Sequence, residues 1–455
     1  MTKLHTASPR PVGVLGLGRS GLAAVRFLSA RGTPVIAWDQ GTVPLDGVDT
    51  LANVEILNGP FPEQRLWHCE SILLSPGIPR THRGVASLIT RGTPVMNDCE
   101  WLFREVQHQN PPPRFVAITG TNGKSTVTTL TGEMLAAPGF QTQTGGNLGQ
   151  AALSLYHEET RMYVLELSSF QLESMHEFRA DSAALLNLSP DHMDRYPRLE
   201  DYLAAKLRVF RNQRPGDVAI INTDDPGLWP AAGPAACGQG VVIVGFSIEK
   251  PVPGGVYVQD GQLIDHRGPQ PQPIMEINRI RIKGRHNLAN AAAAAAISLS
   301  RGASRETIAR VLETFPGLPH RMQWVRTING VDFYNDSKGT NVGAVVESLA
   351  SFDRPLVLIA GGRAKKTDFS ALEQAARQRL RGSVLIGEAA NDLEQVLSNV
   401  APTARAGSMK EAVATSLNLA QPGDIVLLSP ACASFDMFKN FEDRGEKFSE
   451  AVHAL

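Results

Sequence analysis

The segment GTNGKST at residues 120–126 combines two glycines, a lysine and two hydroxyl side chains in the order found in phosphate-binding loops. Backbone N–H groups of such a loop surround phosphate oxygens, the lysine neutralises the β- and γ-phosphates, and the next hydroxyl group binds Mg²⁺. The loop is shorter than the general G-x-x-x-x-G-K-[ST] pattern, because Ile118 stands where the first glycine would be. The segment therefore predicts a binding site for ATP and magnesium.

A second glycine-rich segment, GLGRSG at residues 16–21, matches the pattern by which a helix N-terminus approaches a pyrophosphate, and Asp39 follows where a ribose-binding acid belongs. The pattern recognises a diphosphate and not its base, so NAD, FAD and a uridine diphosphate all fit. A nicotinamide oxidoreductase is therefore one alternative, and a ligand-free turn is another. Two nucleotide sites in one chain favour a ligase that acts on a nucleotide-linked substrate, since a dehydrogenase needs no phosphate loop.

Polar residues after two further predicted strands could bind magnesium. Glu166 ends one of these strands and is followed by two serines, a placement suited to a second Mg²⁺ ligand. Asp191 and His192 follow the next strand, and residue type alone favours a capping aspartate and a structural histidine, because Mg²⁺ prefers oxygen. Cys432 has no histidine partner in the pattern and is interpreted as a buried structural thiol.

The elements that must position these residues alternate between short β-branched runs and longer Ala- and Leu-rich segments, which is typical of βαβ units and parallel sheets. The fold class is therefore predicted to be α/β. Strands are predicted at Val12–Leu15, Val35–Trp38, Ser71–Leu74, Phe115–Ile118, Tyr163–Glu166, Ala183–Asn187, Val218–Asn222, Leu356–Ala360, Val384–Gly387 and Asp424–Leu428.

Length and composition limit the classes of function. A chain of 455 residues predicts two or three domains, and 44 Lys and Arg residues against 45 Asp and Glu residues give no bulk attraction to nucleic acid or to anionic membranes. The four cysteines have no zinc-binding spacing, which suits a reducing compartment. The N-terminus lacks the apolar core of a signal peptide, and the apolar stretches are too short to span a bilayer, so we expect a soluble cytosolic protein.

Breaks in the pattern indicate three domains, at residues 1–97, 98–317 and 318–455. The run Pro111–Pro113 cannot be helical and indicates that a unit ends near it. Residues 233–282, rich in Gly, Pro and alternating apolar residues, predict a β-hairpin appendage. The alanine run Ala291–Ala296 predicts a helix, which FPGLPHR then breaks.

Many ordered segments of the chain resemble the Mur ligases, a family that includes folylpolyglutamate synthetases. They are the phosphate loop, GGN at 145–147, ELSSFQLE at 166–173, DHMDRY at 191–196, AAKLRVF at 204–210, GRHNLANA at 284–291, GLPHR at 317–321, NDSKGTN at 335–341 and SPACASFDMFKNFEDRG at 429–445. The GLGRSG and SPACAS segments resemble the D-glutamate-adding members most.

This resemblance implies a Rossmann-like N-terminal domain for the UDP substrate, a central P-loop-type ATPase domain with a parallel sheet, and a Rossmann-like C-terminal domain that closes over the site. The implied reaction is the ATP-dependent addition of D-glutamate to UDP-N-acetylmuramoyl-L-alanine through an acyl phosphate, in peptidoglycan precursor synthesis. The implied enzyme is a monomer without nucleic-acid or membrane partners. A non-catalytic relative would have lost Lys124, Glu166 or Lys206, and all three are present.

The resemblance also assigns roles to individual residues. Catalysis would involve Lys124, His192, Lys206 and Lys338. ATP would contact Gly120, Thr121, Asn122, Gly123, Lys124, Ser125, Thr126, Asn287, Asn290, Arg321 and Asp336. Two Mg²⁺ ions would be held by Ser125, Glu166, His192 and a carbamylated Lys206. The UDP substrate would contact Gly18, Arg19, Ser20, Asp39, Ser75, Gly77, Asn147 and Ser168, and the amino acid would contact Lys365, Ser434, Phe435 and Phe441.

The sequence departs from the family pattern at two places. Gln40-Gly41 replaces a Thr-Arg pair after Asp39, so one contact to uridine or diphosphate must come from elsewhere. The third-domain loop reads GGRAKK at residues 361–366, where an acidic residue is missing and a cation is added.

The first prediction concerns selection of the amino acid by the third domain. A dicarboxylic amino acid needs cations and hydrogen-bond donors, and Lys365 supplies a cation beside the GG turn. We expect Lys365→Ala to raise KM for D-glutamate far more than KM for ATP in steady-state kinetics. Equal effects on both constants would contradict this role and assign Lys365 to ATP.

Overall fold

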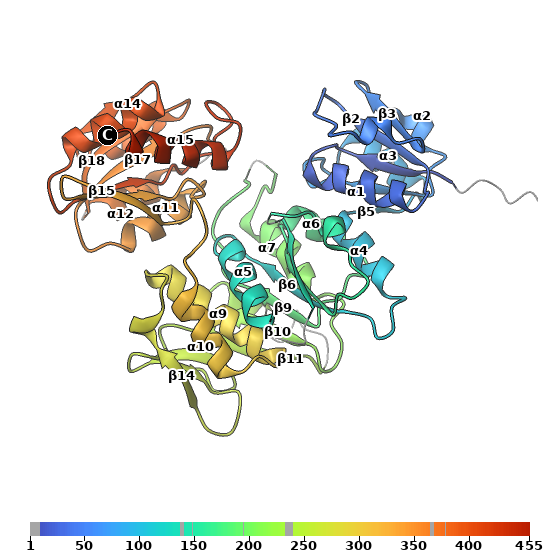
Figure 1. The fold of residues 1–455 in the computed structure, drawn as a ribbon, viewed down its shortest axis with the longest axis horizontal. Coiled ribbons are helices and arrows are strands. Elements are labelled where there is room, and N and C mark those ends of the chain that lie inside the picture. Colours follow the sequence, from blue (N-terminus) through green and yellow to red (C-terminus); the bar gives the residue numbers. More distant parts are fainter. Residues whose placement is uncertain are drawn as a thin grey trace, which may run out of the picture.

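The computed structural model describes residues 10–136, 141–147, 149–193, 195–232, 240–364, 368–377 and 379–455. Its described strands form three sheets, each at the centre of one α/β unit, which confirms the predicted fold class (Figure 1). The N-terminal and C-terminal units both adjoin the central unit and lie apart from each other in this view. No described helix is long and apolar enough to cross a membrane.

The N-terminal unit has a five-stranded parallel sheet in the order β3-β2-β1-β4-β5. The strands are β1 (Val12–Leu15), β2 (Val35–Asp39), β3 (Val54–Asn58), β4 (Ser71–Leu74) and β5 (Val95–Met96), and the helices are α1 (Arg19–Ala30), α2 (Glu63–Leu66) and α3 (Arg83–Thr90). The strand order reverses beside β1, the position at which such sheets bind ligands. Gly21 is required there, because a Cβ atom would lie 1.8 Å from the Gly16 carbonyl oxygen.

The central sheet has nine strands in the order β14-β13-β12-β11-β10-β9-β6-β8-β7. Its parallel part contains β6 (Arg114–Thr119), β7 (Thr142–Gly146), β8 (Met162–Glu166), β9 (Ser182–Leu185), β10 (Val218–Asn222), β11 (Val242–Ser247) and β12 (Val256–Gln259). The antiparallel strands β13 (Gln262–Asp265) and β14 (Gln272–Glu276) continue it. The predicted appendage is thus wrong in one respect, since its strands extend the main sheet.

Alternate residues of the central strands face two separate cores, as the period of a strand requires. Val116 and Ile118 pack under α5 (Lys124–Leu135), α9 (Arg285–Ser300) and α10 (Arg305–Thr314). Phe115 and Ala117 face the other core, near α4 (Asp98–Val106), α6 (Ser169–Glu173), α7 (Leu199–Leu207) and α8 (Leu228–Ala232). The predicted alanine helix is α9, whose small side chains are fully buried and let it pack closely on α5 and the sheet.

The C-terminal unit has six strands in the order β15-β16-β20-β17-β18-β19, all parallel except the hairpin between β15 and β16. The strands are β15 (Gln323–Ile328), β16 (Val331–Asn335), β17 (Leu356–Gly361), β18 (Leu380–Ile386), β19 (Thr403–Arg405) and β20 (Ile425–Leu428). The helices are α11 (Val342–Ala350), α12 (Ser370–Ala376), α13 (Ala390–Leu397), α14 (Met409–Leu419) and α15 (Phe441–His453). Its two hydrophobic cores contain residues of this unit alone.

The N-terminal and central units share one core. The cluster that holds Val14 and Leu28 of the first unit also holds Phe115 and Leu165 of the second. At its edge the Phe27 ring meets the Tyr156 ring edge-on, with centroids 5.4 Å apart. The connection between the two units is therefore apolar and continuous.

Glu100 of α4 ties the start of the central unit to the chain that follows α6. Its fully buried carboxylate accepts hydrogen bonds from the backbone N–H groups of His176, Glu177 and Phe178, at 2.9–3.0 Å, and from Arg104 Nε at 3.1 Å. One side chain thus satisfies a whole turn of backbone that has no strand or helix partner.

We expect Glu100→Ala to lower the free energy of unfolding by about 2–4 kcal/mol in urea titrations, because it leaves buried donors unpaired. Glu105→Ala is the matched control on the same helix. Its carboxylate pairs with Arg31 while 32% exposed, so its loss should cost less than about 1 kcal/mol. Equal losses in the two variants would contradict the role of Glu100.

Candidate active site

The phosphate loop runs from the end of β6 into α5 and is already curved around its own backbone. Gly120 and Gly123 have positive φ angles of 155° and 82°. A Cβ atom on Gly123 would lie 2.3 Å from Asn290 Oδ1, so the loop and α9 approach closely here. Lys124 Nζ donates to the carbonyl oxygens of Gly120 (3.0 Å) and Thr121 (2.7 Å). The lysine therefore folds back over the backbone of its own loop and brings a cation to the turn before α5.

Asn187, which the sequence analysis did not select, holds this loop in place. Its Oδ1 accepts the Asn122 N–H at 2.8 Å, its Nδ2 donates to the Asn122 carbonyl at 3.1 Å, and its carbonyl accepts the Thr121 N–H at 3.0 Å. Asn187 is a polar residue at the end of the predicted strand Ala183–Asn187, and this position could have indicated its role, since β9 and β6 are parallel neighbours whose carboxyl ends lie together.

Glu166 lies at the carboxyl end of β8, on the other side of the loop. Its Oε1 accepts a hydrogen bond from Asn147 Nδ2 at 2.7 Å, whereas Oε2 is buried without a hydrogen-bond partner. A buried carboxylate oxygen without a donor is costly unless a cation is bound. No group of three His, Cys, Asp or Glu side chains in the described ranges forms a metal site by itself, so a cation here would need other ligands as well.

Lys206 of α7 lies 1% exposed beside the same loop and donates from Nζ to the Gly120 carbonyl at 2.7 Å. Nζ also lies 4.2 Å from the centroid of the Tyr202 ring. Burial, and then the charge of Lys124, lower the pKa of Lys206 well below its ordinary value, although Asp191 and Glu166 act in the opposite direction. This environment disfavours the ammonium form and makes the amine available for reaction.

His192 has a left-handed backbone, with φ of 57°, which is uncommon for a residue that carries a Cβ atom. Its ring packs edge-on against Phe170, with centroids 4.8 Å apart, and its Nε2 lies 3.6 Å from Asp191 Oδ2. The turn and these two contacts fix the orientation of the imidazole, and the role of His192 as a magnesium ligand stays a prediction.

The C-terminal unit contributes Lys338, Arg321 and Asp336 to the opposite side. Lys338 Nζ donates to Ser125 Oγ at 2.6 Å, directly across the domain interface. Burial lowers the pKa of Lys338 to about 8, with Glu166 opposing and Arg321 and Lys124 adding to the effect. Asp336 is buried and accepts from Ser348 Oγ (2.7 Å), which fixes the segment that carries Lys338.

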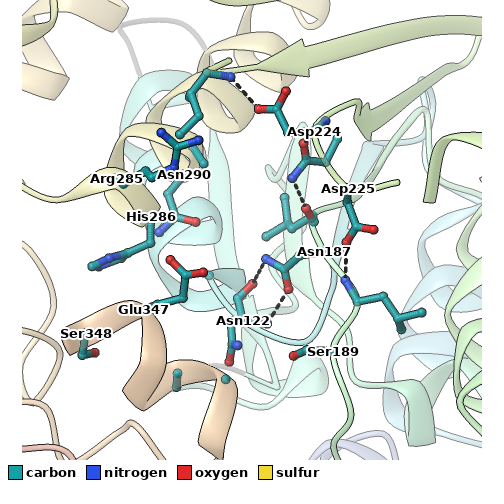
Figure 2. A pocket seen from close by; sticks show the side chains of 18 of the residues that line it. Asn122, Asn187, Ser189, Asp224, Asp225, Arg285, His286, Asn290, Glu347 and Ser348 are labelled. Carbon is teal, nitrogen blue, oxygen red and sulfur yellow. Dashed lines mark hydrogen bonds between the residues drawn. The ribbon is translucent and has the colours of Figure 1, made fainter. Parts of the chain in front are cut away.

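A cavity of about 500 Å³ lies between these two groups and is large enough for a nucleotide. Figure 2 shows Asn122, Asn187, Asp224 and Asp225 on its central-unit side and Glu347 and Ser348 of α11 on the other. Asn290 and His286 of α9 also line it, and Asn287 is buried nearby. The predicted ATP residues Asn122, Gly123, Asn290, Arg321 and Asp336 therefore bound one space, together with the predicted catalytic residue Lys338.

The predicted UDP-substrate residues of the first unit gather at the carboxyl edge of its sheet. Asp39 accepts the Leu17 N–H at 2.8 Å, and Ser75 Oγ donates to the Gly16 carbonyl at 2.7 Å, so both hold the glycine turn. Gly18 is the N-cap of α1, and Ser20 bonds the buried Asp98. Gly77 follows β4 at the same edge, with open space around it.

Two of these predicted residues link the units. Arg19 Nη1 donates to the Gly149 carbonyl at 2.6 Å, beside Asn147, which contacts Glu166. Ser168 caps α6 in a reciprocal pair with Gln171. The glycine turn of the first unit and Glu166 thus both bond to the short segment that contains Asn147 and Gly149.

The predicted amino-acid residues lie around the end of β20 and the start of α15. Ser434 is buried, Phe435 is 65% exposed, and the Phe441 ring lies 5.4 Å from Lys338 Nζ. Lys365 lies outside the described residues. Of the two departures from the family pattern, Arg363 is engaged by Glu388 Oε1 at 2.9 Å, and Gly41 donates its N–H to Asp39.

Arg444 was missed by the sequence analysis, although it stands inside the quoted segment 429–445. It is fully buried and donates to Ser337 Oγ (3.0 Å), to the Ser337 carbonyl (2.8 Å) and to the Cys432 carbonyl (3.1 Å). It therefore joins the NDSKGTN and SPACAS segments. Cys432 is buried, as expected of a structural thiol.

Comparisons with known proteins agree with this geometry. Models described as Mur ligase MurD-like N-terminal domain, Mur ligase middle domain, and Mur ligase glutamate ligase domain match residues 10–97, 118–298 and 320–432. The UDP-N-acetylmuramoylalanine–D-glutamate ligases of Geotalea uraniireducens and Methylococcus capsulatus are 40% and 41% identical to this chain, over 97% of it and 97% and 94% of their own lengths.

Solved structures of lower identity share the fold. A pseudomurein peptide ligase type C from Methanothermus fervidus aligns with a TM-score of 0.62 at 16% identity, over 98% of this chain and 99% of that chain. A MurF ligase from Thermotoga maritima, solved in complex with ADP, aligns with a TM-score of 0.61 at 14% identity, over 98% and 96%.

Proposed function

This chain belongs to the Mur ligase family, and on that premise we propose that it joins D-glutamate to the alanyl carboxylate of UDP-N-acetylmuramoyl-L-alanine with consumption of ATP. It is an ATP-dependent amide ligase of peptidoglycan precursor synthesis. The observation that carries the assignment is a cavity with Asn122 and Gly123 of the phosphate loop on one side and Arg321, Asp336 and Lys338 on the other. An oxidoreductase would not need this arrangement.

The reaction proceeds in two displacements. A carboxylate oxygen of the alanyl group attacks the γ-phosphorus of ATP, ADP leaves, and an acyl phosphate forms. The amine of D-glutamate then attacks the acyl carbon, inorganic phosphate leaves, and the nitrogen loses a proton as the amide forms. Both displacements bring anions together, so cations fixed beforehand supply much of the barrier lowering. Lys124 and Lys338 supply two of these charges from opposite domains.

The donor set around the loop fits Mg²⁺. Glu166 Oε2 is buried and lacks a donor, and Ser125 Oγ lies at the start of α5, where a P-loop hydroxyl binds the metal. Glu166, Ser125 and His192 would hold two ions together with phosphate oxygens and Lys206. When bound, Mg²⁺ neutralises phosphate charge during the transfer.

We include carbamylation of Lys206 in the proposal. The neutral amine attacks CO₂, a C–N bond forms, one proton is released, and the product is an anion with two oxygen ligands. The charge of Lys124, which opposes the ammonium form, would stabilise this anion. Glu166 and Asp191 would repel it, so Mg²⁺ at the same site is part of the proposal.

The two other substrates are assigned to the outer units. The UDP group lies against the turn at Gly18, Arg19 and Ser20, with Asn147 and Ser168 toward the alanyl end. D-Glutamate lies against Ser434, Phe435 and Phe441, with Lys365 as its cation. We further propose a cytoplasmic monomer, since one chain supplies every candidate residue.

The proposed function is tested by phosphate release with ATP, Mg²⁺ and UDP-N-acetylmuramoyl-L-alanine against a panel of D- and L-amino acids. Only D-glutamate should stimulate release, with the amide product seen by mass spectrometry. Lys124→Ala should keep less than about a tenth of wild-type kcat, a loss of at least about 1.4 kcal/mol of transition-state stabilisation, while the UDP substrate still binds. Stimulation by another amino acid alone would overturn the substrate assignment.

A separate rescue experiment tests the carbamate. Lys206→Ala should be nearly inactive and should recover part of its activity when acetate or formate supplies the missing carboxylate. Lys410→Ala, an exposed lysine of α14, should be neither impaired nor stimulated by these anions. A fully active Lys206→Ala, or a folded variant that short carboxylates never rescue, would remove support for the carbamate.

A further inference from the structure

Asn341 is the residue through which the C-terminal unit meets the phosphate loop and the segment after β9 at once. Its Oδ1 accepts the Ala344 N–H at 2.8 Å and so caps α11. Its Nδ2 donates to Asn122 Oδ1 at 3.2 Å and to Asp191 Oδ2 at 3.3 Å. The whole amide group is therefore engaged, on one side within its own unit and on the other across the interface.

The receiving side of this contact is rigid. Asn187 bonds the backbone N–H and carbonyl of Asn122, which fixes the position from which the Asn122 side chain extends. Asp191 is held by its own turn, where Oδ1 accepts the His192 N–H at 2.9 Å. A donor in the C-terminal unit thus meets two acceptors whose positions are set by the loop and by the candidate magnesium region.

The donating side is rigid as well and carries a functional lysine. Between Asp336 and Asn341 the chain makes a tight turn, with the Gly339 N–H bonded to the Asp336 carbonyl (2.8 Å) and the Thr340 N–H bonded to the Lys338 carbonyl (2.9 Å). A displacement of Asn341 therefore moves Lys338, whose Nζ reaches Ser125.

Helix α11 then lies along the nucleotide cavity, which Gly343, Ala344, Glu347 and Ser348 line (Figure 2). Its start fits tightly, because a Cβ atom on Gly343 would lie 3.1 Å from Ser189 Oγ. At its other end Ser351 Oγ lies 3.0 Å from His286 Nδ1 of α9. The helix is thus attached to the central unit at both ends. Of the two ends, the one that begins with Asn341 contacts the phosphate loop.

We propose that Asn341 is a positioning residue that couples closure of the C-terminal unit to the phosphate loop, by docking the start of α11 on Asn122 and Asp191 so that Lys338 reaches the nucleotide. Asn122 and helix α11 line the nucleotide cavity from opposite units, so a nucleotide bound there contacts both sides of the docked interface. The proposal deepens the proposed function and rests on it for its kinetic test, but its structural test does not require ligation.

The test separates the interface bonds from the helix cap. Asn341→Asp keeps an oxygen that caps α11, loses both donated bonds, and faces Asp191 with a like charge. Asn341→Ser keeps a capping oxygen without the second charge. Ser351→Ala is the matched control, since it removes the contact with His286 at the other end of the same helix.

We expect Asn341→Asp to lower kcat about tenfold or more and Asn341→Ser to lower it less. The thermal midpoint and KM for the UDP substrate should stay near wild type, and Ser351→Ala should keep kcat within about twofold. In a double-mutant cycle with Asn122→Ala, the loss from Asn341→Ser should be smaller than in the wild-type background, since one of the two donated bonds is already gone. Wild-type kcat in Asn341→Asp, additive losses in the cycle, or an equal loss in Ser351→Ala would each overturn the proposal.

Closure is measured separately, as the distance between labels on the central and C-terminal units with AMP-PNP and Mg²⁺. The wild-type chain should shorten this distance and Asn341→Asp should not. A chain that closes in this way but fails to ligate D-glutamate would refute the proposed function and leave the role of Asn341 standing. A wild-type chain that never closes, or an Asn341→Asp variant that closes equally, would refute the role itself.

Discussion

The side-chain nitrogens of Lys124 and Lys206 converge on the one carbonyl oxygen of Gly120. Burial, and then repulsion by the charge of Lys124, lower the pKa of Lys206, so this site disfavours a second ammonium group. The arrangement therefore requires anions nearby, which the chain supplies in part through Glu166 and which nucleotide phosphates complete. The fold around the loop can be understood as the means of keeping the charge of Lys124 in place until a polyanion binds.

The central sheet brings these charged groups together through the parallel arrangement of its strands. Its parallel strands β6, β8 and β9 deliver the loop, Glu166 and the Asn187 region to one edge. The two outer units contact the central unit in different ways. The N-terminal unit does so through Arg19 and a continuous apolar core, whereas the C-terminal unit does so through polar pairs such as Lys338 with Ser125. Polar pairs of this kind exchange readily with water, so the last unit is the one suited to opening for substrate entry.

Local patterns in the sequence were sufficient to predict most of the buried strands. Nine of the ten predicted strands occur within two residues of their expected bounds, because buried parallel strands are short apolar runs and the turns after them are glycine-rich. The exception is β18, which begins at Leu380, four residues before the predicted start at Val384. The sequence of residues 233–282 did not show that β11 and β12 belong to the main sheet and not to a hairpin appendage. Apolar and polar residues alternate in the same way in a hairpin and in strands at the edge of a sheet. Asn187, Asn341 and Arg444 were not selected, because their roles arise from partners 65 to 219 residues away. The individual site assignments made from resemblance remain predictions.

The shared core between the first two units has a consequence for how the molecule comes apart. Removing the first unit exposes the apolar surface around Phe27 and Tyr156 that the second unit also uses, so neither keeps its full stability alone. The last unit buries its own residues in cores that no other unit enters. The described strands form three sheets, but from the cores they share we expect the chain to unfold as two cooperative units, whose boundary runs through the nucleotide cavity. A ligand bound in this cavity contacts both folding units. Its binding free energy therefore stabilises both units at once and couples their unfolding.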